Sequence, residues 1–559
     1  YRALDANTTA DNNVAIGQSA LGANTTGSDN TAVGKNAGLS VTTAIKNTLI
    51  GSLAGDALNT GSFNVALGMQ ALSADTKGAK NVAIGQGALE SQNFTSATDS
   101  YNTAVGHFAG GNITTGANNT FVGGLAGDAN TTASDNTAVG RDSLGANTTG
   151  AGNTAFGKDA LKANTSAGNN VAIGKDALIA NTTGGNNTAV GTFALDSNTE
   201  AASNVAVGYL ALGDNTTGAQ NVGIGTNALD ANTTGANNTG IGHAALSANT
   251  TADDNTAVGR DALAANTTGA LNVAVGRSSL LENTTGTKNT VVGVVAGDAL
   301  TTGGRNTALG YEALGSDTKG DVSVAIGNGA LKTQNYTSNT DSLNVAVGHD
   351  SGAAVTTGVT NTLIGALCHD NLTTGDLNTA IGYNLAPSAV GVDSEIVIGS
   401  SITGAGTNTV RIGTGGGTAT LGLDGSDTSW AAASDSRLKK DVADSTVGLS
   451  FLNDLRPVTF KWNAKNEVAE DLPQYDADSS DPIFGEGKAH HGFIAQEVKA
   501  VIDNHSDVLD GNNIWHEDPD GTQQLSQGNL VPMLVKAVQE LSAKIAELES
   551  KPRCKCSGE

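Results

Sequence analysis

The sequence predicts a mainly β protein, in which a long parallel β-solenoid is followed by a smaller α+β domain ending in a helix. A five-residue motif, Asn-(Thr/Val)-Ala-(Val/Ile)-Gly, recurs about twenty-three times along residues 1–415. Its glycines are mostly 17 residues apart, a period typical of solenoid coils and too short for a string of domains. All three tryptophans lie at or beyond Trp430, and the first proline is Pro387. The two parts are therefore built differently.

Each repeat is expected to form one coil, as in residues 136–152, NTAVGRDSLGANTTGAG. Thr137 and Val139 would lie on one face of a short strand and Ala138 on the other. Gly140 suits a bend. The pair at the eighth and ninth positions, usually Ala-Leu, suggests a second short strand, and the following Asn-Thr-Thr-Gly indicates a turn.

Neighbouring coils are expected to complete one another, because no single repeat could bury its thin apolar side alone. The first-position asparagines, such as Asn13, Asn30 and Asn47, would stack as a hydrogen-bonded ladder. At about 4.8 Å per coil, the repeats would make a rod of roughly 110 Å. Alanine-lined faces would let three such rods approach closely.

The repeat resembles the head repeats of trimeric autotransporter adhesins over about residues 10–415. The repeat familiar in that class is shorter, so the resemblance is to the class. It implies a left-handed parallel β-roll with three chains side by side.

A longer duplication lies within the repeats. Residues 66–106 match residues 308–348, and each copy holds a four-residue insertion. The insertions predict bulged loops over Gln92–Tyr101 and Gln334–Leu343. Their aromatic residues are Phe94, Tyr101 and Tyr336. An aromatic residue on such a loop could stack on a sugar ring, or the loop could simply be a place that tolerates insertion.

The solenoid and the second domain meet at the run Ser-Asp-Ser-Arg-Leu-Lys, residues 434–439. We expect residues 416–433 to be a linker, residues 434–550 to be a domain and residues 551–559 to be a charged tail. Taken alone, the run could begin a helix, with Ser434 or Asp435 as its N-cap.

Three further motifs follow that run in order. They are FLNDLRPVTFKW at 451–462, HGFIAQEV at 491–498 and NLVPMLVKAVQELSAKIAELE at 529–549. Together the four motifs resemble the C-terminal intramolecular chaperone domain of endosialidase-type phage tailspikes and tail fibres, over about residues 434–550. The resemblance implies a domain that trimerises the chains, assists folding of the fibre and then cuts itself off.

Carried onto this chain, the resemblance makes Ser434 the nucleophile and Lys439 the general base, and the scissile bond Ala433–Ser434. A serine hydroxyl needs a base to remove its proton. A lysine can serve as that base only where its pKa falls towards neutrality. Lys440 is the rival base, but the motif spacing favours Lys439. The implied activity is that of a serine peptidase that turns over once, on itself, and no other enzymatic activity is expected.

The predicted helix at 529–549 carries a heptad pattern suited to a coiled coil. Its a positions are Val531, Val538 and Ile545, and its d positions are Leu534, Leu541 and Leu548. β-Branched a residues with leucine at d tend to favour two strands, whereas the fibre resemblance implies three. Packing of the helix within its own domain is the alternative.

Composition argues against several classes of partner. The net charge of −25 disfavours binding to a nucleic-acid backbone. No apolar run approaches the roughly 18 residues of a membrane helix, so no membrane insertion is expected. The three cysteines form no disulfide framework, and Cys554-Lys-Cys556 is too short for a metal site. We expect neither a metal nor a cofactor.

The function expected from the sequence is that of a structural and adhesive homotrimeric fibre, such as a phage tail fibre or another receptor-binding appendage of a virion tail. Its partner would be a host cell-surface glycan or protein receptor. One alternative is a trimeric adhesin on a bacterial cell surface. A less favoured one is a glycan-degrading tailspike hydrolase, which would need two carboxylates flanking a glycosidic bond. The acids of the body, such as Asp142, Asp159 and Asp261, instead recur at equivalent coil positions.

Overall fold

A computed structural model describes residues 2–423, 431–432, 436, 439–470, 472, 474–484, 487–508, 513–518 and 521–551. The chain folds into two compact units, Tyr1–Ala433 and Ser434–Glu559. Each unit is described separately below.

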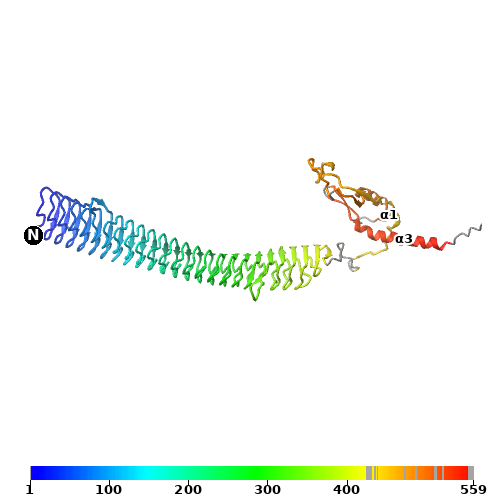
Figure 1. Cartoon of the computed structure of the whole chain (residues 1–559), viewed down its shortest axis with the longest axis horizontal. Coiled ribbons are helices and arrows are strands. Elements are labelled where there is room, and N and C mark those ends of the chain that lie inside the picture. The colour runs from blue at the N-terminus through cyan, green and yellow to red at the C-terminus, as the bar shows by residue number, and fades with distance from the viewer. Residues whose placement is uncertain are drawn as a thin grey trace, which may run out of the picture. The chain divides into compact units, whose positions relative to one another are not determined.

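The first unit is a β-solenoid of about 24 turns with a repeat of about 17 residues, as the sequence predicts. Its coils follow one another in a single stack from the N-terminus (Figure 1). Short strands, one per coil, build one long sheet. They are β1 Val14–Ile16, β2 Thr31–Val33, β3 Thr48–Ile50, β4 Val65–Leu67, β6 Val82–Ile84, β8 Thr103–Val105, β9 Thr120–Val122, β10 Thr137–Val139, β11 Thr154–Phe156, β12 Val171–Ile173, β13 Thr188–Val190, β14 Val205–Val207, β15 Val222–Ile224, β16 Thr239–Ile241, β17 Thr256–Val258, β18 Val273–Val275, β19 Thr290–Val292, β20 Thr307–Leu309, β22 Val324–Ile326, β24 Val345–Val347, β25 Thr362–Ile364, β26 Thr379–Tyr383, β27 Ile396–Ser400 and β28 Thr409–Thr414.

Each strand pairs in parallel with the strand one coil further on, with no slip in register. In β10 and β11, for example, Thr137 lies opposite Thr154 and Ala138 opposite Ala155. Where four residues are inserted, the partners are 21 residues apart instead, as in β6 with β8. Equivalent positions of every repeat therefore stack directly on one another along the unit.

The interior of the solenoid is filled by the residue in the middle of each strand, which is mostly alanine, and by a second core residue in the turns that follow, which is mostly leucine. Ala138 and Leu144 are both fully buried. Thr137 and Val139, on either side of that alanine, are half-buried and face outwards. The expectation of outer faces lined by alanine is therefore wrong for the strands. The residues that a neighbouring rod would meet there are mostly threonine, valine and isoleucine.

The second short strand expected at Ala-Leu does not form. That segment is a series of turns, and Leu144 has a φ of 54°. A left-handed backbone at this leucine turns the chain while the side chain enters the core. The bend at Gly140 does require glycine, because its φ is 137° and an added Cβ would collide with the carbonyl of Gly157 in the next coil.

The predicted asparagine ladder is confirmed. Asn153, which is fully buried, donates two hydrogen bonds: its backbone N–H donates to the Oδ1 of Asn136 at 2.9 Å, and its Nδ2 donates to the carbonyl of Ala167 at 2.9 Å. A second ladder, not predicted, uses the asparagine of Asn-Thr-Thr. There the Nδ2 of Asn147 donates to the Oδ1 of Asn130 at 2.8 Å. Buried polar side chains thus satisfy one another from coil to coil.

The two insertions form extra two-stranded pairings at the side of the coils, between β5 Gly78–Ala79 and β7 Thr98–Asp99, and between β21 Gly320–Asp321 and β23 Thr340–Asp341. Phe94 and Tyr336, predicted on exposed loops, are buried. Only Tyr101 of the three aromatic residues is exposed. The larger part of the sugar-stacking hypothesis is therefore wrong, since a buried ring offers no face to a sugar.

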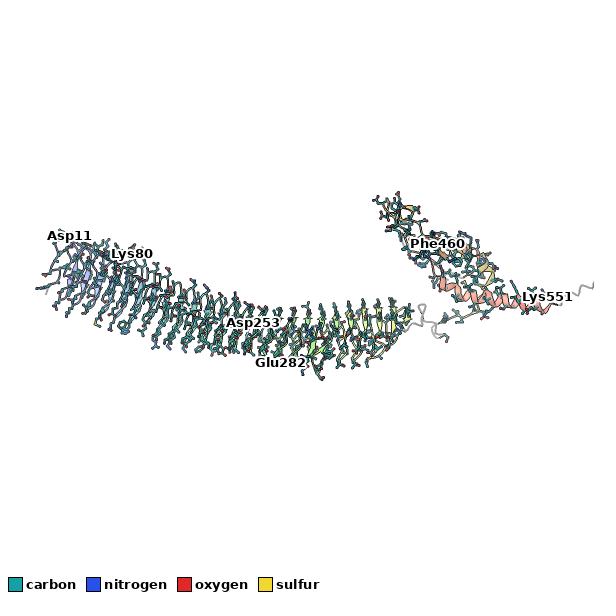
Figure 2. The ribbon with its side chains drawn as sticks, viewed as in Figure 1. Asp11, Lys80, Asp253, Glu282, Phe460 and Lys551 are labelled. Atoms are coloured by element: carbon teal, nitrogen blue, oxygen red, sulfur yellow. The ribbon has the colours of Figure 1, made fainter. Side chains whose placement is uncertain are left out.

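The second unit is a small α+β region with a separate core. Its helices are α1 Leu449–Asp454, α2 Ala495–Asn504 and α3 Val531–Ser550, with 3₁₀ turns η2 Lys465–Glu467 and η4 Gln527–Leu530. Its strands form two antiparallel pairs, β31 Val458–Phe460 with β32 His490–Gly492, and β33 Trp515–Glu517 with β34 Gln523–Leu525. Figure 2 labels Phe460 on β31 and Lys551 just past α3. The helix predicted over 529–549 is thus present, and its α-helical part begins at Val531.

Candidate functional site

The C-terminal end of the solenoid closes with antiparallel strands. β28 pairs in parallel with β27, the last step of the regular stack. It then turns back into β29 Gly417–Gly422, which pairs with it along six residues. β30 Ala431–Ala432 pairs with β29 in turn, with Ala419 opposite Ala432 and Thr420 opposite Ala431. The stretch predicted as a linker, 416–433, therefore contains two strands of the main sheet.

Arg411 fixes this end of the solenoid. It occupies the strand position that holds the core alanine in most other coils, opposite Val397 of the preceding strand. Its Nη1 donates to the carbonyls of Thr403 at 2.9 Å and Gly404 at 3.2 Å, and its Nε donates to the Oγ1 of Thr420 at 3.1 Å. One guanidinium thus ties the last coil to β29, where no further coil would cover the interior.

Two buried ionisable residues interrupt the repeat near the same end. Glu395 stands where the ladder has asparagine, and its carboxylate accepts hydrogen bonds from the backbone N–H groups of Ser388 at 3.0 Å and Gly406 at 2.7 Å. His369 takes the core position otherwise held mostly by leucine and glycine, and neither of its ring nitrogens has a hydrogen-bond partner. Burial lowers the pKa of His369 to about 4, although the nearby Glu395 carboxylate opposes that shift. Comparing repeats position by position would have found both residues.

Two members of the predicted cleavage site, Ala433 and Ser434, lie outside the described residues. Lys439 is described; its side chain is exposed and its backbone N–H donates to the carbonyl of Ser436 at 3.2 Å. Lys440 is exposed as well. The assignment of Ser434 and Lys439 as a catalytic pair therefore stays a prediction. The cysteines of the tail, Cys554 and Cys556, also lie outside the described part of the chain.

The sequence motifs of the second domain become its packed elements. The motif FLNDLRPVTFKW contains most of α1 and all of β31. The motif HGFIAQEV contains most of β32 and the first turn of α2. Phe451 of α1 is fully buried, with Val498 and Ile502 of α2 in the same core. Glu540 of α3 accepts the backbone N–H of Leu449 at 2.9 Å. A carboxylate at the first residue of α1 suits the positive end of that helix, although α1 is short.

The heptad residues of α3 lie on its exposed side. Ala537 is the one residue of this helix that is buried, whereas Val538 is 60% and Leu548 65% exposed. All six predicted a and d residues are exposed; they are Val531, Leu534, Val538, Leu541, Ile545 and Leu548. Packing of this face within the domain, the alternative weighed above, does not occur in the single chain.

A second apolar surface runs along the solenoid. It consists of the outward residues at the two ends of each three-residue strand, and we call it the strand face. In the three-residue strands of the main sheet, from β1 to β25, every residue on it is threonine, valine, isoleucine, leucine or phenylalanine, without a charge. Ile16 is 60% and Phe156 54% exposed. Charged side chains lie elsewhere on the coils, for example Lys80, which bonds Asp99 at 2.7 Å on the outer surface (Figure 2).

Other chemistry is sparse. Among the described residues, no group of three or more His, Cys, Asp or Glu side chains is arranged to hold a metal ion. The described helices include none with the length and apolarity to span a bilayer. Asp159 is paired with Lys158 at 2.8 Å and Lys162 at 3.0 Å. This pairing lowers the pKa of the Asp159 carboxyl, against the opposing effect of its burial.

Comparison with known proteins places the second domain in a family. Residues 434–507 match the family model described as "Chaperone of endosialidase". No curated protein and no solved structure matches the chain. The match begins at the residue where the second compact unit begins. The chain thus carries a chaperone-of-endosialidase domain behind a β-solenoid body.

Proposed function

We propose that this protein is a homotrimeric fibre of a virion tail, whose C-terminal domain assembles three chains and then removes itself. The rod would be the mature part and would attach to a host cell-surface glycan or protein. The observation that carries the proposal is the chaperone-of-endosialidase match placed directly behind a solenoid.

Two unpartnered apolar surfaces support the homotrimer. The heptad face of α3 is exposed in the single chain, and the strand face of the solenoid is half-buried to exposed. Exposed apolar surfaces of this extent are typical of interaction sites. Further copies of the same chain would cover these surfaces, because each copy carries the same strand face along its coils and the same heptad face on α3. A heptad face alone would not favour three helices over two.

Self-removal follows from the chemistry assigned to Ser434 and Lys439. The Oγ of Ser434 attacks the carbonyl carbon of Ala433 while Lys439 takes its proton. The C–N bond breaks, and the proton passes to the departing amine of Ser434. Water then hydrolyses the resulting ester, which leaves a carboxylate on Ala433 and a free hydroxyl on Ser434. Loss of the assembly domain would make the folded fibre kinetically hard to reverse.

A denaturing gel of freshly expressed protein tests the proposal. The wild type should separate into residues 1–433 and 434–559, with Ser434 as the new N-terminus. Ser434→Ala and Lys439→Ala should stay whole, whereas Lys440→Ala, one residue along and also exposed, should be cut normally. A wild type that assembles and stays whole would contradict self-removal.

A further inference from the structure

We propose that a carbohydrate-binding site lies at the first insertion, Gln92–Tyr101, where Tyr101 and Phe63 stack against the pyranose rings of a polysaccharide. The inference rests on the proposed function, for which it names the ligand class and the site. Tyr101 is 52% and Phe63 47% exposed, whereas Phe94, the other aromatic residue of this insertion, is buried. The exposed rings are therefore the ones that can meet a ligand.

Phe63, Lys80 and Tyr101 occupy the same corner of three successive coils, directly before the ladder asparagine. Each has a φ between 49° and 64°. A left-handed backbone suits asparagine, aspartate and glycine and is unfavourable for a bulky side chain. From 118 to 254 this corner position holds only asparagine, aspartate, glycine, serine or glutamine. Two aromatic rings at such a corner indicate a use beyond turning the chain.

A lysine lies between the two rings. The Nζ of Lys80 donates to the Oη of Tyr101 at 2.8 Å and to the Oδ2 of Asp99 at 2.7 Å, on the outer surface of the coils (Figure 2). One coil before Phe63, the Nζ of Lys46 lies 5.5 Å from the centroid of the Phe63 ring. Basic and aromatic side chains thus alternate along this corner, one coil or about 4.8 Å apart.

This set of groups fits a sugar better than a purely apolar partner. The C–H bonds on one face of a pyranose ring carry weak positive charge and pack against the negative face of an aromatic ring. The hydroxyls of the sugar need polar partners, and the Lys80 ammonium and the Asp99 carboxylate supply a donor and an acceptor next to Tyr101. Phe63 and Tyr101 are two coils apart, about 10 Å. That spacing suits alternate rings of an extended polysaccharide.

The second insertion has the same fold without the exposed rings. In both insertions a buried glutamine donates to a buried aspartate at 2.6 Å, and one aromatic ring is buried. Leu343 stands at the position of Tyr101. Arg305 stands at the position of Phe63 and donates to Asp341 at 2.8 Å. The exposed rings are therefore not needed to form an insertion of this kind, and the second copy lacks the site.

Two other roles for the exposed rings make different predictions. Tyr101 and Lys80 could hold the insertion against the neighbouring coil, in which case truncating Tyr101 lowers the thermal stability. Another chain could cover the rings in the assembly, in which case the same truncation changes the native mass. A binding site predicts that carbohydrate binding is lost while the native mass stays the same.

The test measures binding of the full chain to a printed array of defined microbial oligosaccharides. We expect the wild type to bind at least one of them and Tyr101→Ala to bind it at least ~10-fold more weakly, because a central aromatic anchor carries much of the binding free energy. Tyr101→Phe keeps the ring and should bind within about threefold of the wild type. Leu343→Ala, at the equivalent position of the second insertion, is the matched control and should bind as the wild type does. Light scattering measures the native mass of each protein.

Each outcome decides for or against the site. Equal binding by Tyr101→Ala and the wild type overturns the inference and leaves the proposed function standing. An array to which the wild type does not bind does the same, since the fibre could attach to a protein receptor. A changed native mass in Tyr101→Ala assigns the ring to a contact between chains and refutes the site.

Two further results separate the site from the proposed function. If Tyr101→Ala fails to fold, Phe63→Ala replaces it, and the inference then requires weaker binding by that variant. A wild type that binds an oligosaccharide as a single, uncut chain would refute the proposed function and leave the carbohydrate site standing.

Discussion

The two units of this chain bury their side chains in opposite ways. The solenoid completes its interior within one chain, with stacked alanine and leucine and two asparagine ladders. The second domain has a small core around Phe451 and leaves the heptad face of its longest helix exposed. The second domain thus leaves an apolar face uncovered in the single chain. The proposed self-removal predicts this contrast between a lasting rod and a temporary assembly domain.

Substitutions on the heptad face of α3 should have the largest effect on assembly. Replacing Leu534 and Leu541 together with aspartate should abolish assembly of the full chain, because two charges would be buried in each helix of a coiled coil. Light scattering should then report single chains, and cleavage should be lost as well. The control is Gln539→Asp with Ser542→Asp, which adds the same charge to the same helix at exposed positions outside the heptad core. Trimers of the leucine variant would contradict the role of this face.

The strand face gives a second test, on the rod itself. Ile224→Asp with Ile241→Asp places two charges on adjacent coils of that face. We expect the mature rod, residues 1–433, to separate into single chains, because each charge would otherwise lose its hydration in the interface. Thr234→Asp with Thr251→Asp adds the same charge at exposed turns of the same coils and should leave the assembly intact. Equal assembly of the two double variants would remove the strand face as the interface.

His369 should make the end of the solenoid sensitive to acid. Its pKa lies at about 4 when folded and near 6.5 when unfolded, so the unfolded chain binds the proton first as the pH falls. The contribution of neutral His369 to the free energy of unfolding is fully present above pH 6.5 and is lost as the pH falls towards 4. The loss is on the order of 3 kcal/mol, as the width of that window implies. The nearby carboxylate of Glu395 makes this loss smaller, because it favours the protonated form of His369.

His369→Leu restores the residue found at this core position in many of the other coils. The substitution should remove the part of the acid-dependent loss of stability that is due to His369. Thermal unfolding of both proteins at pH 7 and at pH 4.5 measures it. The variant should lose less stability than the wild type on acidification. An equal loss would show that His369 takes up its proton without cost in the folded rod.

The smallest expected effect concerns the second asparagine ladder. Asn198→Ala removes the donor to Asn181 at 2.8 Å and the bond to Ala201 at 3.1 Å, and it leaves Asn215 without its acceptor. Leaving buried polar groups unpaired costs about 1–3 kcal/mol. Asn186→Gly is the matched control, since Asn186 is exposed with a φ of 60° that glycine readily adopts. Equal thermal unfolding of the two variants would contradict the importance of the ladder.

The periodic part of the fold could be predicted from sequence because stacking repeats every contact at one spacing. Because of that regularity, the coil, its strand and the first asparagine ladder could all be predicted from the repeat. It did not reveal which strand face is interior, because Ala138 and Val139 are both small and apolar and alternate with period two. The ladder that includes Asn147 was missed because Asn-Thr-Thr-Gly also fits a turn, and the structure uses it as both.

The end of the rod could not be predicted in the same way. β29 and β30 carry no repeat motif, and their pairing is antiparallel, so the period that reveals the other strands is absent there. Arg411 was overlooked because only its position in the coil, and not its residue type, marks it as a core position. The predicted pairing of Ser434 with Lys439 requires a side-chain arrangement that the run 434–439 does not itself specify.

The central claim is that three chains assemble and then lose their C-terminal domains. The most direct measurement is the native mass of the purified, fully matured protein. The account predicts three copies of residues 1–433, with residues 434–559 absent or separately bound. A single chain, or a trimer of intact 559-residue chains that persists through maturation, would contradict it.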